Sequence, residues 1–118
     1  MTAKKSSIKK PVLPSEEVLI EELSDEPVRV KCVLQARLDT ISEEQKKYGN
    51  VGWSVILAYM TILDEDNDPV LTVQEWEIFQ AANRDVWEAD IVPVLLRVNG
   101  FDRLANKKKS TIQKQDSQ

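Results

Sequence analysis

A broad apolar stripe between residues 48 and 62 constrains the fold of this chain more than any other feature of its sequence. The apolar side chains that recur there at intervals of three or four residues are Tyr48, Val51, Val55, Tyr59 and Ile62. This spacing is typical of one face of an α-helix that is buried against other elements. We therefore predict a helix over residues 43–63, which ends in an acidic stretch.

A second helix is predicted over residues 73–83. Thr72 is followed three residues later by Glu75, which is the pattern of a capping box at the start of a helix. Trp76 and Phe79 then form its apolar stripe. The helix therefore has both a start signal and a face to bury.

A third helix is predicted over residues 86–99. Its apolar side chains are Val86, Trp87, Ile91, Val94, Leu95 and Val98. Pro93 has no N–H group and would clash with the preceding turn of a helix, so we expect Asp90 to cap the segment anew and to place Pro93 in a first turn. Gly100 is expected to end the helix in a left-handed conformation.

The remaining signals describe the N-terminal part of the chain and its organisation. Residues 15–26 can form a short helix that Ser15 begins and Pro27 ends, whereas residues 28–38 suggest a strand-like start that runs into a helical turn. The prediction is a mainly α fold, a small bundle of three main helices with a short N-terminal strand or helix. A flexible basic arm (1–14) precedes this single helical domain (15–104), and a flexible basic tail (105–118) follows it.

Composition excludes several classes of function. The chain has no histidine and a single cysteine, Cys32, so it lacks the residues for histidine-based catalysis, for histidine-ligated metals and for a thiolate zinc site. Carboxylates are abundant, but no spacing isolates a general acid from a general base. We therefore expect a protein that is not an enzyme and has no cofactor.

Charge and hydropathy limit the partners and the location. Residues 1–10 carry +4 and residues 102–118 carry +3, so the net charge of −4 leaves −11 for residues 11–101. A body this acidic argues against nucleic acid as a partner. No apolar run approaches the roughly 20 residues of a membrane span, and the N-terminus has no apolar region typical of a secretory signal. We therefore expect an intracellular protein without membrane contact.

The acidic stretch "DEDNDPVLTVQE" at residues 64–75 has the ligand spacing of a calcium-binding EF-hand loop, with Asp64, Asp66, Asp68 and Glu75 at loop positions 1, 3, 5 and 12. Pro69 stands where such a loop needs a glycine with positive φ, which proline cannot adopt. The stretch is therefore interpreted as a solvated turn between two helices, and no metal ligand is assigned. A calcium-binding helical module is kept as the weaker alternative.

Residues 53–110, about half the chain, resemble the small tail assembly chaperones of bacteriophages. "GWSVILAYMTILDEDNDPVLTVQEW" is similar to the family's helix that ends in a "DEDG-P-F-T" type segment, and "VWEADIVPVLLRVNGFDRLANKKKS" is similar to the helix that follows it. The chain departs from the family's pattern in two places. Asn67 or Asp68 stands where relatives often have glycine, and Leu71 replaces the usual aromatic residue.

The resemblance implies a mainly helical, non-catalytic factor of the host cytoplasm. Such proteins hold the aggregation-prone tape measure protein and help the tail tube protein to assemble around it; whether this chain also forms a homo-oligomer stays open. A phage structural protein of the head–tail joining or tail-terminator type is the alternative. The aromatic residues expected either to bind the partner in a groove between helices or to pack in the core are Trp53, Tyr59, Trp76, Phe79 and Trp87.

Overall fold

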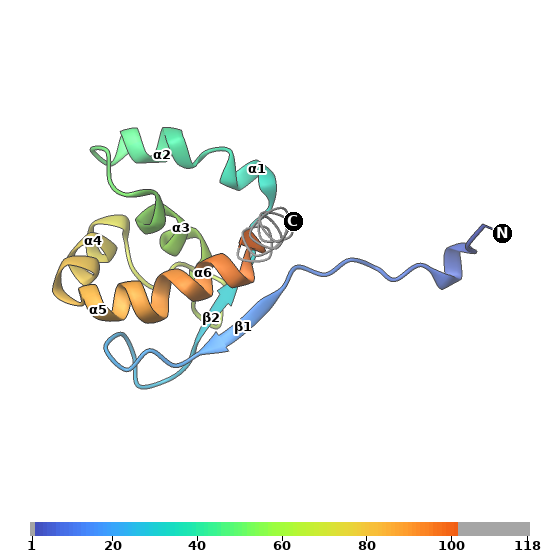
Figure 1. Cartoon of the computed structure of the whole chain (residues 1–118), viewed down its shortest axis with the longest axis horizontal. Helices are drawn as coiled ribbons and strands as arrows, with labels where there is room; N and C mark the ends of the chain where they lie inside the picture. The colour runs from blue at the N-terminus through green and yellow to red at the C-terminus, as the bar shows by residue number, and fades with distance from the viewer. Residues whose placement is uncertain (1, 102–118) are drawn as a thin grey trace, which may run out of the picture.

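The computed structural model describes residues 2–101, which form a mixed α/β fold (Figure 1). Three antiparallel strands lie in the order β1 (Ser15–Val18), β2 (Val28–Lys31) and β3 (Ile62–Leu63). The helices are α1 (Gln35–Leu38), α2 (Ile41–Lys47), α3 (Trp53–Thr61), α4 (Val73–Ala82), α5 (Arg84–Val86) and α6 (Val92–Val98), with a π-helical turn η2 (Trp87–Ile91) between α5 and α6 and a 3₁₀ turn η1 (Lys5–Ser7) near the N-terminus. The prediction of a mainly α, three-helix bundle is therefore wrong.

The sheet buries one of its faces against the helices. Val30 pairs with both Glu16 and Ile62, and Val30 and Ile62 are fully buried. Helices α3 and α6 both contact β2 from this inner side. On the outer face Arg29 lies between Glu17 and Leu63. The fold thus has a helical layer over one side of a small sheet.

The predicted helix over residues 43–63 is wrong in its continuity, because the structure divides it into α2 and α3. Gly49 and Asn50 have φ values of +78° and +63°, and Gly52 is extended. Positive φ suits glycine and asparagine and cannot continue a right-handed helix. Of the apolar stripe, Val51, Val55 and Ile62 are nonetheless buried in the core, whereas Tyr48 and Tyr59 are half-buried.

The segment over which we predicted a short helix, residues 15–26, begins with a strand instead. Residues 15–18 become β1, which pairs with β2 from Ser15–Lys31 to Val18–Val28. The helix expected after Ser15 is therefore wrong, whereas residues 28–38 do form a strand followed by the helical turn α1. Pairing of β1 with β2 outweighs the helix-start signal of Ser15 and the glutamates that follow it, because tertiary contacts often override local propensity.

Helix α4 confirms the second predicted helix to within one residue and also its capping box. The Thr72 hydroxyl accepts from the Glu75 N–H at 3.2 Å, and a Glu75 carboxylate oxygen accepts from the Thr72 N–H at 3.0 Å. These two bonds satisfy backbone N–H groups that have no partner within the helix.

Replacing Thr72 with alanine is expected to lower the free energy of unfolding by about 1 kcal/mol, since this is the usual cost of losing an N-cap side chain. The measurement is urea unfolding of Thr72→Ala, Glu75→Ala and the double variant. The double variant should cost less than the sum of the single variants, whereas Thr72→Ala combined with Glu77→Ala, an exposed change on the same helix, should be additive. Additivity in both cycles would contradict the capping box.

The third predicted helix is present as a continuous helical run from α5 through η2 to α6. Asp90 does not cap a new helix, so that part of the prediction is wrong; instead the Val92 N–H bonds to the Trp87 carbonyl five residues earlier. This wider π-helical spacing precedes Pro93 and lets the chain pass a residue that cannot donate a backbone hydrogen bond. Gly100 has a φ of +82°, which confirms its left-handed conformation at the helix end.

The N-terminal arm extends away from the folded body in Figure 1, and residues 2–14 are all exposed. Its root is tied to the sheet, because the Pro14 carbonyl accepts from the Cys32 N–H at 2.8 Å. The predicted flexibility of residues 1–14 stays a prediction. The predicted basic tail at 105–118 lies outside the residues that the structure describes.

Candidate functional site

Three of the five aromatic residues considered for partner binding lie in the hydrophobic core. Trp76 and Trp87 are 0% and 1% exposed, and Phe79 is 8% exposed. The Trp76 ring packs edge-on against Phe79, with centroids 5.5 Å apart, and at a tilt against Trp87, at 6.0 Å. In this structure these side chains join α4 to η2, and a partner could reach them only if the core opened.

The other two aromatic residues lie on α3 and differ in exposure. Tyr59 is half-buried and packs against the core. Trp53, the first residue of α3, is 40% exposed, and its ring contacts Phe101 edge-on with centroids 5.9 Å apart. Trp53 is therefore the member of the predicted set whose side chain is most available to a partner.

We define an apolar end cluster as Trp53 and Phe101, whose rings are in contact, together with Leu34, which follows a residue bonded to Asn99 near Phe101. Leu34 is 61% exposed, and Phe101 is half-buried. The Val33 N–H donates to Oδ1 of Asn99 at 3.0 Å, which holds the residue before Leu34 close to the chain that leads into Phe101. Figure 1 accordingly shows α1 beside the end of α6.

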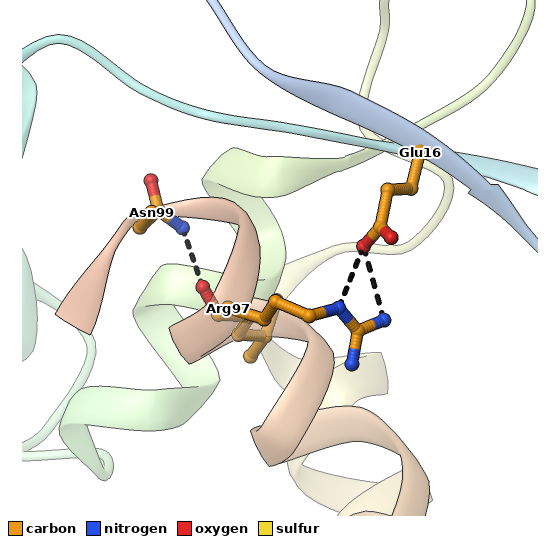
Figure 2. Close-up of polar contacts among 4 residues, drawn as sticks. Glu16, Arg97 and Asn99 are labelled. Atoms are coloured by element: carbon orange, nitrogen blue, oxygen red, sulfur yellow. Dashed lines mark hydrogen bonds and ion pairs between the residues drawn. The ribbon is translucent and has the colours of Figure 1, made fainter. Parts of the chain in front are cut away.

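Polar contacts of α6 fix this end of the molecule (Figure 2). Besides accepting from Val33, the Asn99 side chain donates from Nδ2 to the Leu95 carbonyl at 2.8 Å. Arg97, two residues earlier, places two guanidinium nitrogens 3.0 and 3.1 Å from one carboxylate oxygen of Glu16 on β1. Both partners of this ion pair are about half exposed, so it contributes at most about 1 kcal/mol. Asn99 is the more consequential contact, because it satisfies a backbone N–H of another element.

The acidic turn at residues 64–68 is organised by its own first carboxylate. Oδ1 of Asp64 accepts from the N–H groups of Asp66 and Asp68 at 2.8 and 3.0 Å. Asn67 has a φ of +64°, and its Oδ1 accepts from Nη1 of Arg29 at 3.0 Å. The turn connects β3 to α4, so it does not directly join two helices as the sequence suggested.

Two of the four candidate calcium ligands already bind backbone N–H groups. Asp64 holds the turn, and Glu75 belongs to the capping box of α4. Within residues 2–101 there is no group of three or more histidine, cysteine or acidic side chains placed to hold a metal ion. The geometry therefore adds no support to the weaker alternative of a calcium module.

Cys32 is half-buried at the end of β2, where its thiol lies 3.5 Å from the Val33 carbonyl. None of the helices in residues 2–101 is long and apolar enough to cross a membrane.

Two members of the apolar end cluster, Leu34 and Phe101, were not among the partner-binding residues predicted from the sequence. Phe101 follows Gly100 directly, and a large apolar residue just after a helix-ending glycine commonly packs back on the helix. This signal could have identified Phe101. Leu34 had no comparable signal, since its exposure depends on the change from strand to helix at residues 32–35.

No model of a protein family, no curated protein and no solved structure matches this chain.

Proposed function

We propose that the protein is a bacteriophage tail assembly chaperone that acts in the host cytoplasm without catalysis. It would hold the tape measure protein in a soluble form and promote assembly of the tail tube protein around it. The observation that carries this proposal is the apolar end cluster, in which Trp53 and Phe101 both belong to the segment that resembles the family.

The mixed fold is compatible with this proposal, although the resemblance implied a mainly helical protein. Strands β1 and β2 lie at residues 15–31, outside the segment 53–110 that carries the resemblance. Within that segment the quoted motifs have structural roles here: Asp64 organises the acidic turn, Thr72 caps α4, and Asn99 fixes the end of α6. The resemblance therefore concerns how this part of the chain is held, and the binding surface is argued separately.

An amphipathic helix of the tape measure protein is the kind of client that suits the apolar end cluster. Exposed tryptophan is enriched among residues that dominate binding energy, and the apolar face of a client helix would cover Trp53 and Phe101 as in other helix-binding surfaces. The net charge of −11 on residues 11–101 helps to keep a protein soluble while it exposes apolar side chains.

Co-expression with the tape measure protein of the same phage is expected to yield a soluble complex, and Trp53→Ala should weaken that complex at least about tenfold. Isothermal titration with the client segment measures the loss. The control is Ile78→Ala, which removes another exposed apolar side chain, 68% exposed on α4, and should change affinity little.

Failure of every tape measure segment to form a complex would refute the proposal. Equal losses for Trp53→Ala and Ile78→Ala would move the binding surface away from the apolar end cluster. Mass spectrometry of purified virions separates the alternative, because a structural protein of the head–tail joining or tail-terminator type would remain in the particle and a chaperone would not.

A further inference from the structure

The outer face of the sheet carries a hollow that the proposed chaperone function does not use. Glu17, Arg29 and Leu63 line its base in the order of the strands. The segment 23–27 between β1 and β2 forms one wall, and residues 64–66 of the acidic turn form the other. Its volume is about 580 Å³, enough for several side chains of an extended peptide.

The chemistry of this hollow is acidic with apolar side chains between the charges. The ionisable residues that line it are Glu17, Glu26, Arg29, Asp64, Glu65 and Asp66, five carboxylates against one guanidinium. Half-buried Leu23, Val70 and Leu71 add apolar surface. The complementary ligand is an extended segment that carries both lysines and aliphatic side chains.

The N-terminal arm of this chain has that composition. Its basic residues are Lys4, Lys5, Lys9 and Lys10, and its aliphatic residues Ile8, Val12 and Leu13 are 60%, 86% and 38% exposed. In Figure 1 the distal part of the arm projects away from the rest of the described residues. The arm and the hollow are therefore complementary in charge and each leaves apolar surface exposed.

The direction of the arm favours the hollow of a second copy over its own. Hydrogen bonding between Pro14 and Cys32 fixes its root at the edge of the sheet. Pro11 and Pro14 have restricted φ values and favour extended conformations in the residues before them, which opposes a tight reversal back to the acidic turn. Residues 8–14 in such a conformation span roughly 20 Å, so the arm reaches outward to another molecule.

We propose that two copies of this chain associate by exchanging their N-terminal arms, each arm lying in the acidic hollow of the other copy. A smaller hollow of about 380 Å³ beside β1 shares Glu17 and Arg29 with the first, and Lys31 and Val12 at the root of the arm also line it. Together they form a track from the root of the arm to the acidic turn. Reciprocal exchange gives a closed two-fold assembly in which both tracks are filled.

Charge reversal on either side tests this proposal. Lys9→Glu with Lys10→Glu changes the arm, and Glu26→Lys with Glu65→Lys changes the hollow. The arm variant brings the charge of residues 1–10 from +4 to 0, and the hollow variant brings the charge of the lining from −4 to 0. Because each double variant alone loses this charge complementarity, it should dimerise at least about tenfold more weakly than the unchanged chain in sedimentation equilibrium. A mixture of the two variants should form a heterodimer, because the unchanged arm of one variant then meets the unchanged hollow of the other.

The mixing experiment separates exchange between copies from docking within one chain. An arm in its own hollow would leave the unchanged chain monomeric and the mixture without a heterodimer, and either result overturns the proposal. Lys46→Glu with Lys47→Glu, at exposed positions on α2, is the matched control and should leave dimerisation unchanged. Circular dichroism verifies that all variants are folded. Since Trp53 is unchanged in these variants, failure of dimerisation is distinguishable from failure of tape measure binding.

Discussion

Replacing Trp76 with alanine is expected to lower the free energy of unfolding by about 3–5 kcal/mol, the usual range for removing a buried aromatic side chain. Trp76 has no exposed surface and contacts both Phe79 and Trp87, so the change leaves a cavity between α4 and η2. Such a loss is a large part of the stability of a domain of this size. Urea unfolding followed by far-ultraviolet circular dichroism measures it without depending on tryptophan fluorescence.

Trp76→Phe refines this prediction, because the indole N–H of Trp76 is buried and has no hydrogen-bond partner within residues 2–101. Phenylalanine keeps an aromatic ring and removes a buried polar group that has a desolvation cost, so it should destabilise far less than alanine. Trp53→Ala is the matched control at a 40% exposed site and should cost about 1 kcal/mol or less. Equal losses at Trp53 and Trp76 would contradict the assignment of Trp76 to the core.

Replacing Asn99 with alanine is expected to lower the free energy of unfolding by about 1–3 kcal/mol. The Val33 N–H would lose its acceptor in a partly buried site, and an unsatisfied backbone group there costs this much. The specific measurement is amide hydrogen exchange, in which Val33 should lose protection beyond the change in global stability.

Asn83 provides a close control for Asn99. Its Nδ2 donates to the Phe79 carbonyl at 3.3 Å, just as the Nδ2 of Asn99 donates to the carbonyl of Leu95, also four residues earlier. Within residues 2–101, however, the Oδ1 of Asn83 accepts no hydrogen bond from the backbone N–H of another element, whereas the Oδ1 of Asn99 accepts one from Val33. Asn83→Ala should therefore cost less and leave exchange at Val33 unchanged. Asn99→Asp keeps the acceptor and should retain protection of Val33. Loss of protection with both Asn99→Asp and Asn83→Ala would point to general loosening of the helices.

The sequence predicted the elements whose signals are local. Thr72 and Glu75, only three residues apart, mark the start of α4, and Gly100 marks the end of α6. Each of these features depends on contacts between residues close in the chain, which is why pattern and spacing suffice.

The sheet could not be predicted in the same way, because its pairings join distant segments. Residues 15–18 carry a helix start and acidic residues, yet they become β1 when paired with β2, and β3 is only two residues long. Gly49 and Gly52 lie at the break between α2 and α3, but the apolar stripe that runs across the break is typical of one continuous helix. Likewise, exposure of Trp53 and burial of Trp76 depend on which faces the tertiary contacts cover.

The packing of α6 against β2 has a consequence for how the chain folds as it is synthesised. Val28 and Val30 on β2 leave the ribosome early, but their cover of Val94, Leu95 and Val98 comes from the last helix of the described chain. At about 5–20 residues per second, making the residues between Val30 and Val98 takes roughly 3–14 s. Helix α3 is made earlier in that interval, and β2 of the nascent chain lacks the part of its native cover that α6 provides until Val98 has been synthesised.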